Sequence, residues 1–293
     1  MNLIKPQICI YHAPCQDGFT AAWAIWKRWP DVEFIPGVYG QDPPENLVGK
    51  CVLLVDFTYK RPVLEKMAEQ AYCITILDHH KSAQEDLAPF IRPVLGFDYW
   101  ELDEGGQEVR LPRIQACFDM NKSGAMMAWE YANPDLAAPE LVKHVQDRDL
   151  WWFALEGTRQ IAATLSSHPY DFNVWDRLAV ECQSEVARAQ LIAEGQAIER
   201  KHHKDIAELL AICTRTMVIG GHRVPVANLP RTLSSDGAGK LAEGQPFGAC
   251  YYENSEGKRV FSLRVRDGGV DVSAIAVAYG GGRNVDAAIT DAQ

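Results

Sequence analysis

The sequence predicts an α/β fold in which an N-terminal domain built on a parallel sheet is joined by a long helix to a smaller α/β domain. Three observations predict this organisation. Apolar segments of strand length alternate with helical segments in the first half of the 293 residues, which is typical of strand–helix–strand crossover units. Residues 184–212 then form one long helical pattern with a charged face, broken only by Gly195. After residue 214, short strand-like segments alternate with Gly-containing turns. The expected bounds are 1–183 for the first domain, 184–214 for the connecting helix and 215–293 for the second domain.

The first four elements follow from apolar runs and from the residues that end them. The run at 7–12 predicts a strand, and the helical pattern at 17–29 starts near an aspartate and stops before a proline. A second strand is expected at 32–36. The run at 51–57 is almost wholly apolar, as expected for a strand that is covered on both faces.

The next elements continue the alternation. A helical pattern at 59–70 precedes an apolar strand at 72–77. Residues 92–114 are polar and rich in turn residues, with a local acidic patch, and predict an inserted hairpin or loop. Beyond it, a strand is expected at 115–118 and helices at 123–131 and 139–151.

The second domain is expected to be a small α/β unit, well within ordinary domain size. Its predicted strands are 216–219, 223–227, 248–252 and 260–265, and its predicted helix is 272–279. A glycine triplet follows that helix.

Composition excludes some classes of function. The formal net charge is −10, which argues against a broad basic surface that wraps long duplex nucleic acid, because such binding needs many Lys and Arg contacts to phosphate. No apolar run approaches the ~18 residues of a membrane span, and no signal-peptide pattern opens the sequence. The eight cysteines are scattered and form no Cys-x-x-Cys pair. We therefore expect a protein of a reducing, cytoplasmic compartment.

Polar side chains follow several predicted strands at the point where each strand ends. Because ligands of an open parallel sheet collect beyond the carboxyl ends of its strands, we expect these side chains to lie together. The first segment gives His12, Cys15 and Asp17, the second Asp56, the third Asp78, His79 and His80, and a fourth, helical segment gives Asp147 and Asp149.

Histidine and carboxylate together suit Mn²⁺, Co²⁺, Fe²⁺ or Zn²⁺. Two such ions about 3.5–4 Å apart need a shared carboxylate, and Asp56, at the end of a central strand, is suited to bridge them. Taken singly, Asp56 would be interpreted as a capping residue and His12 as a core histidine. Asp147 or Asp149 would be interpreted as part of a solvated helix face or as a partner of Arg148. The recurrence of metal-capable groups at three strand ends favours a site over these readings.

These motifs, in this order, resemble the four motifs of the DHH phosphoesterase superfamily, and the C-terminal part resembles its DHHA1 substrate domain. The resemblance covers nearly the whole chain and points to the oligoribonuclease-like and exopolyphosphatase-like branch. The matching residues are His12-x-x-Cys15-x-Asp17-Gly18, Asp56, Asp78-His79-His80 and Asp147 in the first part, and Val226-Ala227-Asn228, Ser262-Leu263-Arg264 and Gly280-Gly281-Gly282 in the second.

The resemblance implies a two-metal phosphohydrolase with a role for each motif. It implies that two divalent cations, Mn²⁺ first with Mg²⁺ or Co²⁺ as alternatives, activate a water. One metal would be held by His12 and Asp56, and the other by Asp17, Asp56, His79 and Asp147. Asp78 would support the ligands without contacting metal, and His80 would meet the phosphate. In the second domain, the glycine triplet Gly280–Gly282 would approach a substrate phosphate through its backbone N–H groups.

Two positions depart from the pattern of the superfamily. Cys15 stands where the superfamily often has an aspartate, and it is either a metal ligand or a passive loop residue. Arg283 follows the glycine triplet where a histidine is usual, and arginine there still suits phosphate. Arg264 and Arg266 lie two apart on a predicted strand, so they point the same way. They form either an anion clamp or a solvent-facing pair.

Three functions remain open from the sequence. The preferred one is hydrolysis of phosphoester bonds in short nucleotides or oligonucleotides. The second is a polyphosphate or pyrophosphate hydrolase, and the third is a nucleotide-binding sensor with weakened catalysis. We expect a short phosphorylated substrate, no long duplex nucleic acid and no membrane as partners. The oligomeric state stays open, a homodimer included.

Overall fold

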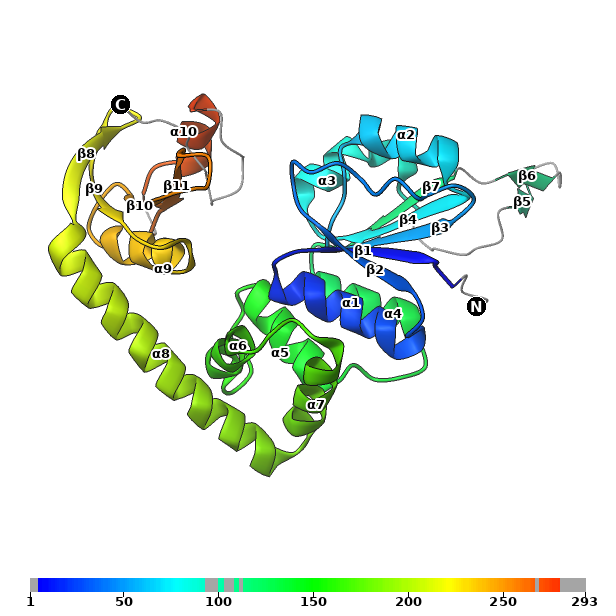
Figure 1. The fold of residues 1–293 in the computed structure, drawn as a ribbon, viewed down its shortest axis with the longest axis horizontal. Coiled ribbons are helices and arrows are strands. Elements are labelled where there is room, and N and C mark those ends of the chain that lie inside the picture. Colours follow the sequence, from blue (N-terminus) through cyan, green and yellow to red (C-terminus); the bar gives the residue numbers. More distant parts are fainter. Residues whose placement is uncertain (1–4, 93–99, 103–107, 111–112, 267–268, 280–293) are drawn as a thin grey trace. The chain divides into compact units, whose positions relative to one another are not determined.

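The computed structural model describes residues 5–92, 100–102, 108–110, 113–266 and 269–279 (Figure 1). The chain divides into two compact units, Met1–Ile198 and Glu199–Gln293. The boundary falls inside the long helix α8, Glu185–Cys213, which agrees in extent with the helical pattern of the sequence. Each unit has its own sheet and its own core.

The first unit is built on a five-stranded sheet in which every neighbouring pair is parallel. The strands lie in the order β2-β1-β3-β4-β7. Their bounds are β1 Ile8–His12, β2 Glu33–Gly37, β3 Cys51–Val55, β4 Cys73–Asp78 and β7 Ile114–Phe118. The expected α/β class with a parallel sheet is therefore confirmed.

The register places the carboxyl ends of β1, β3 and β4 beside one another at one end of the sheet. Tyr11 pairs with Val55, and Val55 pairs with Leu77, so β1, β3 and β4 end side by side. The strand order reverses direction between β1 and β3, which is where ligands of doubly wound sheets usually bind. The topology thus places the polar residues after these strands at one location.

Helices cover both faces of this sheet (Figure 1). Their bounds are α1 Gln16–Arg28, α2 Arg61–Gln70, α3 Lys81–Asp86, α4 Gly124–Ala132, α5 Glu140–Asp149, α6 Thr158–Ser167 and α7 Phe172–Gln183, with a short 3₁₀ turn at Ala88–Phe90. We did not predict α3, α6 or α7 from the sequence. The expected insertion at 92–114 contains an antiparallel pair, β5 Trp100–Leu102 and β6 Glu108–Arg110.

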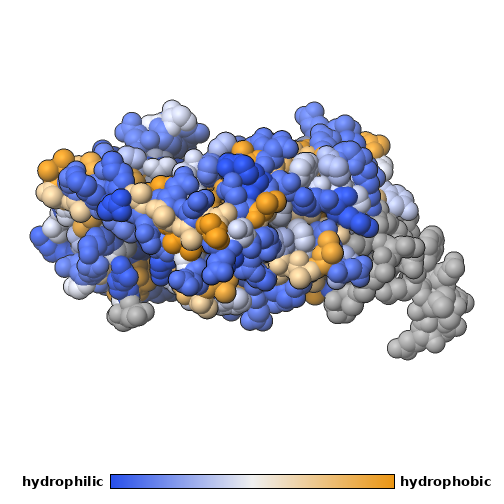
Figure 2. All heavy atoms as spheres, turned by 90° about the horizontal axis from the view of Figure 1, so that it is seen from below, coloured by the Kyte–Doolittle hydropathy of each residue, from blue (hydrophilic) through white to orange (hydrophobic). Residues whose placement is uncertain are grey.

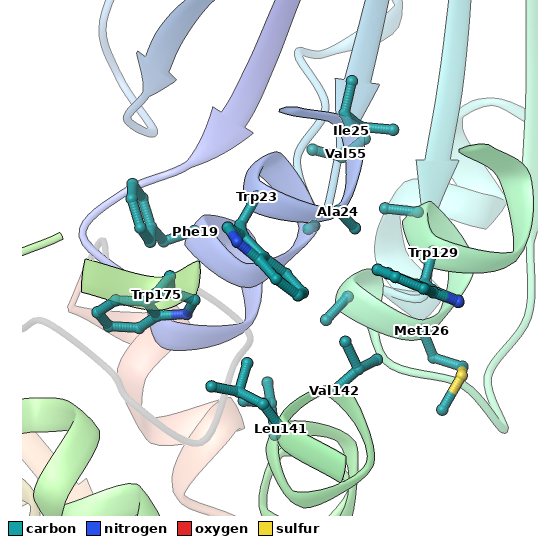
Figure 3. Close-up of a cluster of buried hydrophobic side chains, with 14 of the residues drawn as sticks. Phe19, Trp23, Ala24, Ile25, Val55, Met126, Trp129, Leu141, Val142 and Trp175 are labelled. Carbon is teal, nitrogen blue, oxygen red and sulfur yellow. The ribbon is translucent and has the colours of Figure 1, made fainter. Parts of the chain in front are cut away.

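Two hydrophobic clusters fix the helices on the sheet. Alternate residues of the strands face opposite ways: Ile8 and Ile10 join the cluster under α2, whereas Cys9 joins the cluster under α1, α4, α5 and α7. In the second cluster, Trp23 stacks on Trp129 with 5.8 Å between ring centroids (Figure 3). This packing holds α1 and α4 side by side and so fixes where their first residues lie.

Gly195 does not interrupt α8. A Cβ atom at this position would lie 1.9 Å from the carbonyl oxygen of Gln160, so glycine permits the close approach of α8 to α6. The glycine that breaks the predicted helical pattern is therefore needed for a packing contact within the first unit.

The second unit contains a four-stranded sheet in the order β11-β10-β9-β8. β9 and β10 are parallel, and the other two pairs are antiparallel. The bounds are β8 Arg215–Ile219, β9 His222–Asn228, β10 Gly248–Glu253 and β11 Arg259–Arg264, with helices α9 Arg231–Leu241 and α10 Val272–Ala278. The four strands and α10 were expected, whereas α9 was not.

A helix that crosses a membrane requires a long run of predominantly apolar residues. Hydrophobic residues form small separate groups on the largely hydrophilic face drawn in Figure 2. Within the described part of the chain, no helix combines the length and apolarity needed to cross a bilayer. All eight cysteines lie in the described residues, and none of them forms a disulfide bond.

Candidate metal centre

The metal-capable residues that follow β1, β3 and β4 converge on Asp56. Among the described residues, three groups of His, Cys and Asp side chains bring their ligand atoms within 4.8 Å of one another. Asp56 and His79 each belong to two of these groups. The groups are His12, Cys15 and Asp56; Asp56, His79 and His80; and Asp17, His79 and Asp149.

Asp56 lies at the centre and is almost fully buried. It directly follows β3 and has a φ of 55°, a left-handed conformation that aspartate adopts more readily than most residues. Its backbone N–H donates to the carbonyl of Leu77. One carboxylate oxygen lies 3.1 Å from His79 Nε2 and the other 3.5 Å from His12 Nδ1. Within the described ranges no backbone N–H donates to this carboxylate, so its contacts do not support a capping role.

His79 Nε2 faces three carboxylates. It lies 3.1 Å from Asp56, 3.5 Å from Asp149 and 3.7 Å from Asp17. Burial alone would lower the pKa of His79, but the hydrogen bond and negative charge of Asp56, together with the charges of Asp17 and Asp149, raise this pKa to about 9. His79 is therefore protonated at neutral pH without metal, and a metal ion that binds Nε2 must displace this proton.

Burial opposes ionisation of the carboxylates around His79 as well. Burial, and then the negative charge of Asp56, raise the pKa of both Asp17 and Asp149. Asp56 also loses solvation, but hydrogen bonds from His12 and His79 hold its pKa down at about 2. Three carboxylates this close are mutually repulsive, and a divalent cation between them would relieve that repulsion. The donor set thus fits a metal ion.

Asp17 is fixed by the first turn of α4. Its two carboxylate oxygens accept hydrogen bonds from the backbone N–H groups of Gly124, at 2.6 Å, and of Ala125, at 3.0 Å. A Cβ atom on Gly124 would lie 2.4 Å from Asp56 Cβ and 2.9 Å from Asp17 Oδ2. The helix can therefore reach both carboxylates only because residue 124 is glycine. We did not single out Gly124 from the sequence.

We expect Gly124→Ala to weaken metal binding at least about tenfold, since displacing groups that orient metal ligands usually costs 10- to 100-fold in affinity. The added methyl group must displace Asp56, Asp17 or the start of α4. Isothermal titration of the metal-free protein with Mn²⁺ measures the effect. Gly239→Ala in α9, where a Cβ atom meets nothing within 4 Å, is the matched control. Equal affinities in the two variants would contradict the tight geometry around Asp56.

Asp78 organises the turn that carries the two histidines. It is fully buried, and its Oδ1 accepts from the backbone N–H groups of His79, at 2.7 Å, and His80, at 3.2 Å. The same oxygen lies 2.6 Å from His80 Nδ1. Asp78 thereby fixes the His80 ring, which leaves Nε2 as the free nitrogen. This placement supports the expected supporting role of Asp78.

Cys15 lies within the group formed with His12 and Asp56. Burial, and then the charges of Asp56 and Asp17, raise the pKa of its thiol to about 12. The thiol is therefore protonated at neutral pH unless a metal displaces the proton. Its location agrees with the ligand alternative, and ligation itself stays a prediction.

Tyr39 is a neighbour of the site that sequence reasoning missed. Its ring lies edge-on to His12, with 5.3 Å between centroids, and contacts Phe57 at 4.9 Å. It follows β2 in a polar turn, and a lone tyrosine there gives no sequence signal of function.

Of the two acids in the fourth segment, Asp149 rather than Asp147 lies among the possible metal ligands. Asp147 points its carboxylate into the loop after α5, where it accepts from the N–H groups of Ala154 and Leu155 and from the hydroxyl of Thr158. Asp149 instead reaches His79. We therefore replace Asp147 by Asp149 in the candidate metal centre.

In the second unit, Arg264 and Arg266 both lie against α9. The Arg264 guanidinium donates to the hydroxyl of Ser235 at 2.6 and 3.1 Å, and Arg266 donates to the carbonyl of Gly239 at 3.3 Å. Arg266 lies beyond the end of β11 at Arg264, so the expectation that both arginines stand on one strand was wrong, although both side chains contact α9. Phosphate binding by them stays a prediction. Gly280, Gly281, Gly282 and Arg283 lie outside the described residues.

Comparison with one solved structure supports the fold. A solved structure described as the DHH domain of a member of the s1p family of ribosomal proteins superposes with a TM-score of 0.50 and 14% identity, over 94% of this chain and 75% of that one. The chain thus shares the fold of a DHH-domain protein. A structure of an uncharacterized Helicobacter pylori protein matches with a TM-score of 0.46 and 14% identity, covering 96% of this chain and 91% of that one.

A curated sequence relative gives no functional information. An uncharacterized protein of Acanthamoeba polyphaga mimivirus is 26% identical over 311 aligned residues, which cover 96% of this chain. The chain spans 66% of the viral protein, slightly less than two thirds of its length. No protein-family model matches the chain.

Proposed function

We propose that this protein is a metal-dependent phosphohydrolase of the DHH type that cleaves phosphoester bonds in short nucleotides or oligonucleotides. The observation that carries the proposal is the convergence of Asp17, Asp56, His79 and Asp149, with His12 and Cys15 beside them, where β1, β3 and β4 end. The fold shared with a DHH-domain protein supports it.

We propose that the ligand groups form two metal sites linked by Asp56. His12, Cys15 and Asp56 form one group, and Asp17, His79 and Asp149 form another whose His79 contacts Asp56. We assign two divalent cations to them, Mn²⁺ first, because carboxylate and imidazole donors both suit this ion. Such ions lower the pKa of a bound water and neutralise phosphoryl oxygens.

The residues of the chain have separate tasks in this scheme. Asp56 carries the charge that both sites share, and the α4 amides hold Asp17 in place. His80 is oriented by Asp78 through Nδ1. Burial alone would lower the pKa of His80, but the hydrogen bond and charge of Asp78 raise this pKa and so favour the imidazolium form. In that form its Nε2–H donates a hydrogen bond to a phosphate oxygen of the substrate. Neither the fold nor the donor set selects between phosphodiesters, phosphomonoesters and polyphosphate.

A hydrolysis panel with added Mn²⁺ tests the function. We expect turnover of ribodinucleotides or 3′-phosphoadenosine 5′-phosphate above that of tripolyphosphate. Turnover of tripolyphosphate alone would favour the polyphosphate alternative. Bound metal with no turnover of any member would contradict the proposed activity and support a nucleotide-binding sensor.

We expect Cys15→Asp to tighten Mn²⁺ binding, since a carboxylate suits this cation better than a thiol that must first lose its proton. Titration of the metal-free variant and wild type at the same pH measures the change, with Cys117→Asp, at the end of β7, as the matched control. An affinity that is unchanged or weaker at position 15 would place Cys15 outside the ligand set.

A further inference from the structure

An exposed group of aromatic side chains follows the candidate metal centre along the chain. It lies in the loop between α5 and α6 (Figure 1). Trp151 is 69% exposed and Trp152 is 53% exposed. Leaving two neighbouring tryptophan side chains in water gives up the large favourable free energy of burying them. A bound molecule that covers these side chains would restore part of that free energy of burial.

The backbone under this group is strained. Among the described residues, three that are not glycine have a positive φ: Asp56 at 55°, Trp151 at 61° and Phe153 at 50°. Bulky residues rarely adopt this conformation, and such outliers concentrate at functional sites. Asp56 lies in the candidate metal centre, and Trp151 and Phe153 lie two and four residues after Asp149 in the chain.

Asp147 holds the strained loop in place. Its carboxylate accepts from the N–H groups of Ala154 and Leu155, and its backbone carbonyl accepts from those of Trp152 and Phe153. The aromatic residues are thus presented on a loop whose backbone is tied down, rather than on a free surface segment.

The rings form an ordered arrangement with one arginine. The Arg159 guanidinium lies 3.5 Å from the centroid of the Phe153 ring and 5.9 Å from that of Trp151. Trp151 meets Phe153 edge-on, with 4.9 Å between centroids and 74° between planes. No described carboxylate pairs with Arg159. The guanidinium therefore stays available to an anion beside the exposed Trp151 ring.

The group is close to the candidate metal centre along the chain. Trp151 is two residues after Asp149, so their Cα atoms are no more than ~7.6 Å apart. The Asp149 carboxylate in turn lies 3.5 Å from His79 Nε2. One nucleotide unit spans about this distance between its base and its phosphate.

We propose that Trp151, Phe153 and Arg159 form a platform on which a nucleobase of the substrate stacks while its phosphate enters the metal centre. Aromatic faces with a neighbouring arginine are the groups that bind unpaired bases independently of sequence. The net charge of −10 and the small size of the platform suit one or two nucleotides. This inference rests on the proposed function and selects nucleotides over inorganic polyphosphate as its substrates.

Binding of AMP and of ribose 5-phosphate tests the platform without catalysis. Isothermal titration calorimetry in the presence of Mn²⁺ gives both affinities for wild type, Trp151→Ala and Trp151→Phe. Loss of a base–aromatic stack should weaken AMP binding about five- to one-hundredfold in Trp151→Ala. Binding of ribose 5-phosphate should not change, and Trp151→Phe should restore most of the affinity for AMP.

Tyr72→Ala is the matched control, since Tyr72 is an exposed aromatic residue directly before β4, at the opposite edge of the same sheet. Its AMP affinity should equal that of wild type. The platform is overturned if Trp151→Ala and Tyr72→Ala bind AMP alike, or if AMP binds no better than ribose 5-phosphate. AMP binding that is undetectable at millimolar concentration would also overturn it.

The hydrolysis panel separates this inference from the proposed function. If the platform fails and the function holds, Trp151→Ala will cleave nucleotides with wild-type KM. If the function fails and the platform holds, no variant will show turnover, but AMP will still bind more weakly to Trp151→Ala than to Tyr72→Ala.

Discussion

Asp56→Asn is expected to lower hydrolysis at least about a hundredfold, because residues that only orient metal ligands already cost 10- to 100-fold when changed. The substitution removes the negative charge that His12 and His79 both contact. The fold should persist, since asparagine also tolerates the left-handed conformation that residue 56 adopts. Turnover in the presence of excess Mn²⁺ and metal content after dialysis are the measurements.

Asp119→Asn provides the control for this prediction. Asp119 follows β7, which lies two strands from β3 in the same sheet. Its carboxylate accepts from the N–H of Asn121 and lies 3.7 Å from Lys122. Asp119 is thus an acid at the same end of the sheet as Asp56, but its carboxylate caps a turn. We expect its variant to retain activity and metal. Near wild-type turnover by Asp56→Asn would contradict the assignment of Asp56 as the carboxylate shared by two metal ions.

The sequence predicted the sheet and the strand ends well because each depends on local signals. Buried parallel strands require continuous apolar runs, so a polar residue such as Asp56 directly after a run marks the strand end. The left-handed backbone at this residue has no comparable signal, because aspartate is common in turns of many types.

The missed helices depend on packing rather than on local propensity. Helix α9 contains two glycines and two serines among 11 residues, a composition that disfavours a helix. It forms because Ala238 packs into a core with Leu229 and Cys250. Such a tertiary contact cannot be read from the segment alone.

The sequence left the choice between Asp147 and Asp149 open for a related reason. Residues two apart on a helix point about 200° apart, so only one of them can face the sheet edge. Which one does so depends on the rotation of α5, and that rotation is set by its buried residues Leu141, Val142 and Val145 packing with α1 and α4 (Figure 3). The sequence shows that one acid is a candidate ligand without showing which.

The two aspartates should therefore respond oppositely to substitution by asparagine. Asp149→Asn is expected to weaken Mn²⁺ affinity at least about tenfold, because a carboxylate that faces His79 at 3.5 Å is lost. In the metal-free protein the same change should leave Tm equal or higher, since it removes one of three mutually repelling carboxylates. Burial and the charge of Asp56 already raise the pKa of Asp149, as expected for a group that is destabilised without a cation.

Asp147→Asn should show the reverse pattern. The amide replaces one acceptor oxygen by a donor, so one of the hydrogen bonds from Ala154, Leu155 and Thr158 is lost. A bond to a charged acceptor contributes about 1.5–3 kcal/mol, which lowers Tm by roughly 3–12 °C in a domain of this size. Mn²⁺ affinity should stay within about threefold of wild type. Calorimetric Tm values and Mn²⁺ titrations of both variants decide the assignment, and a loss of Mn²⁺ binding confined to Asp147→Asn would return Asp147 to the metal centre.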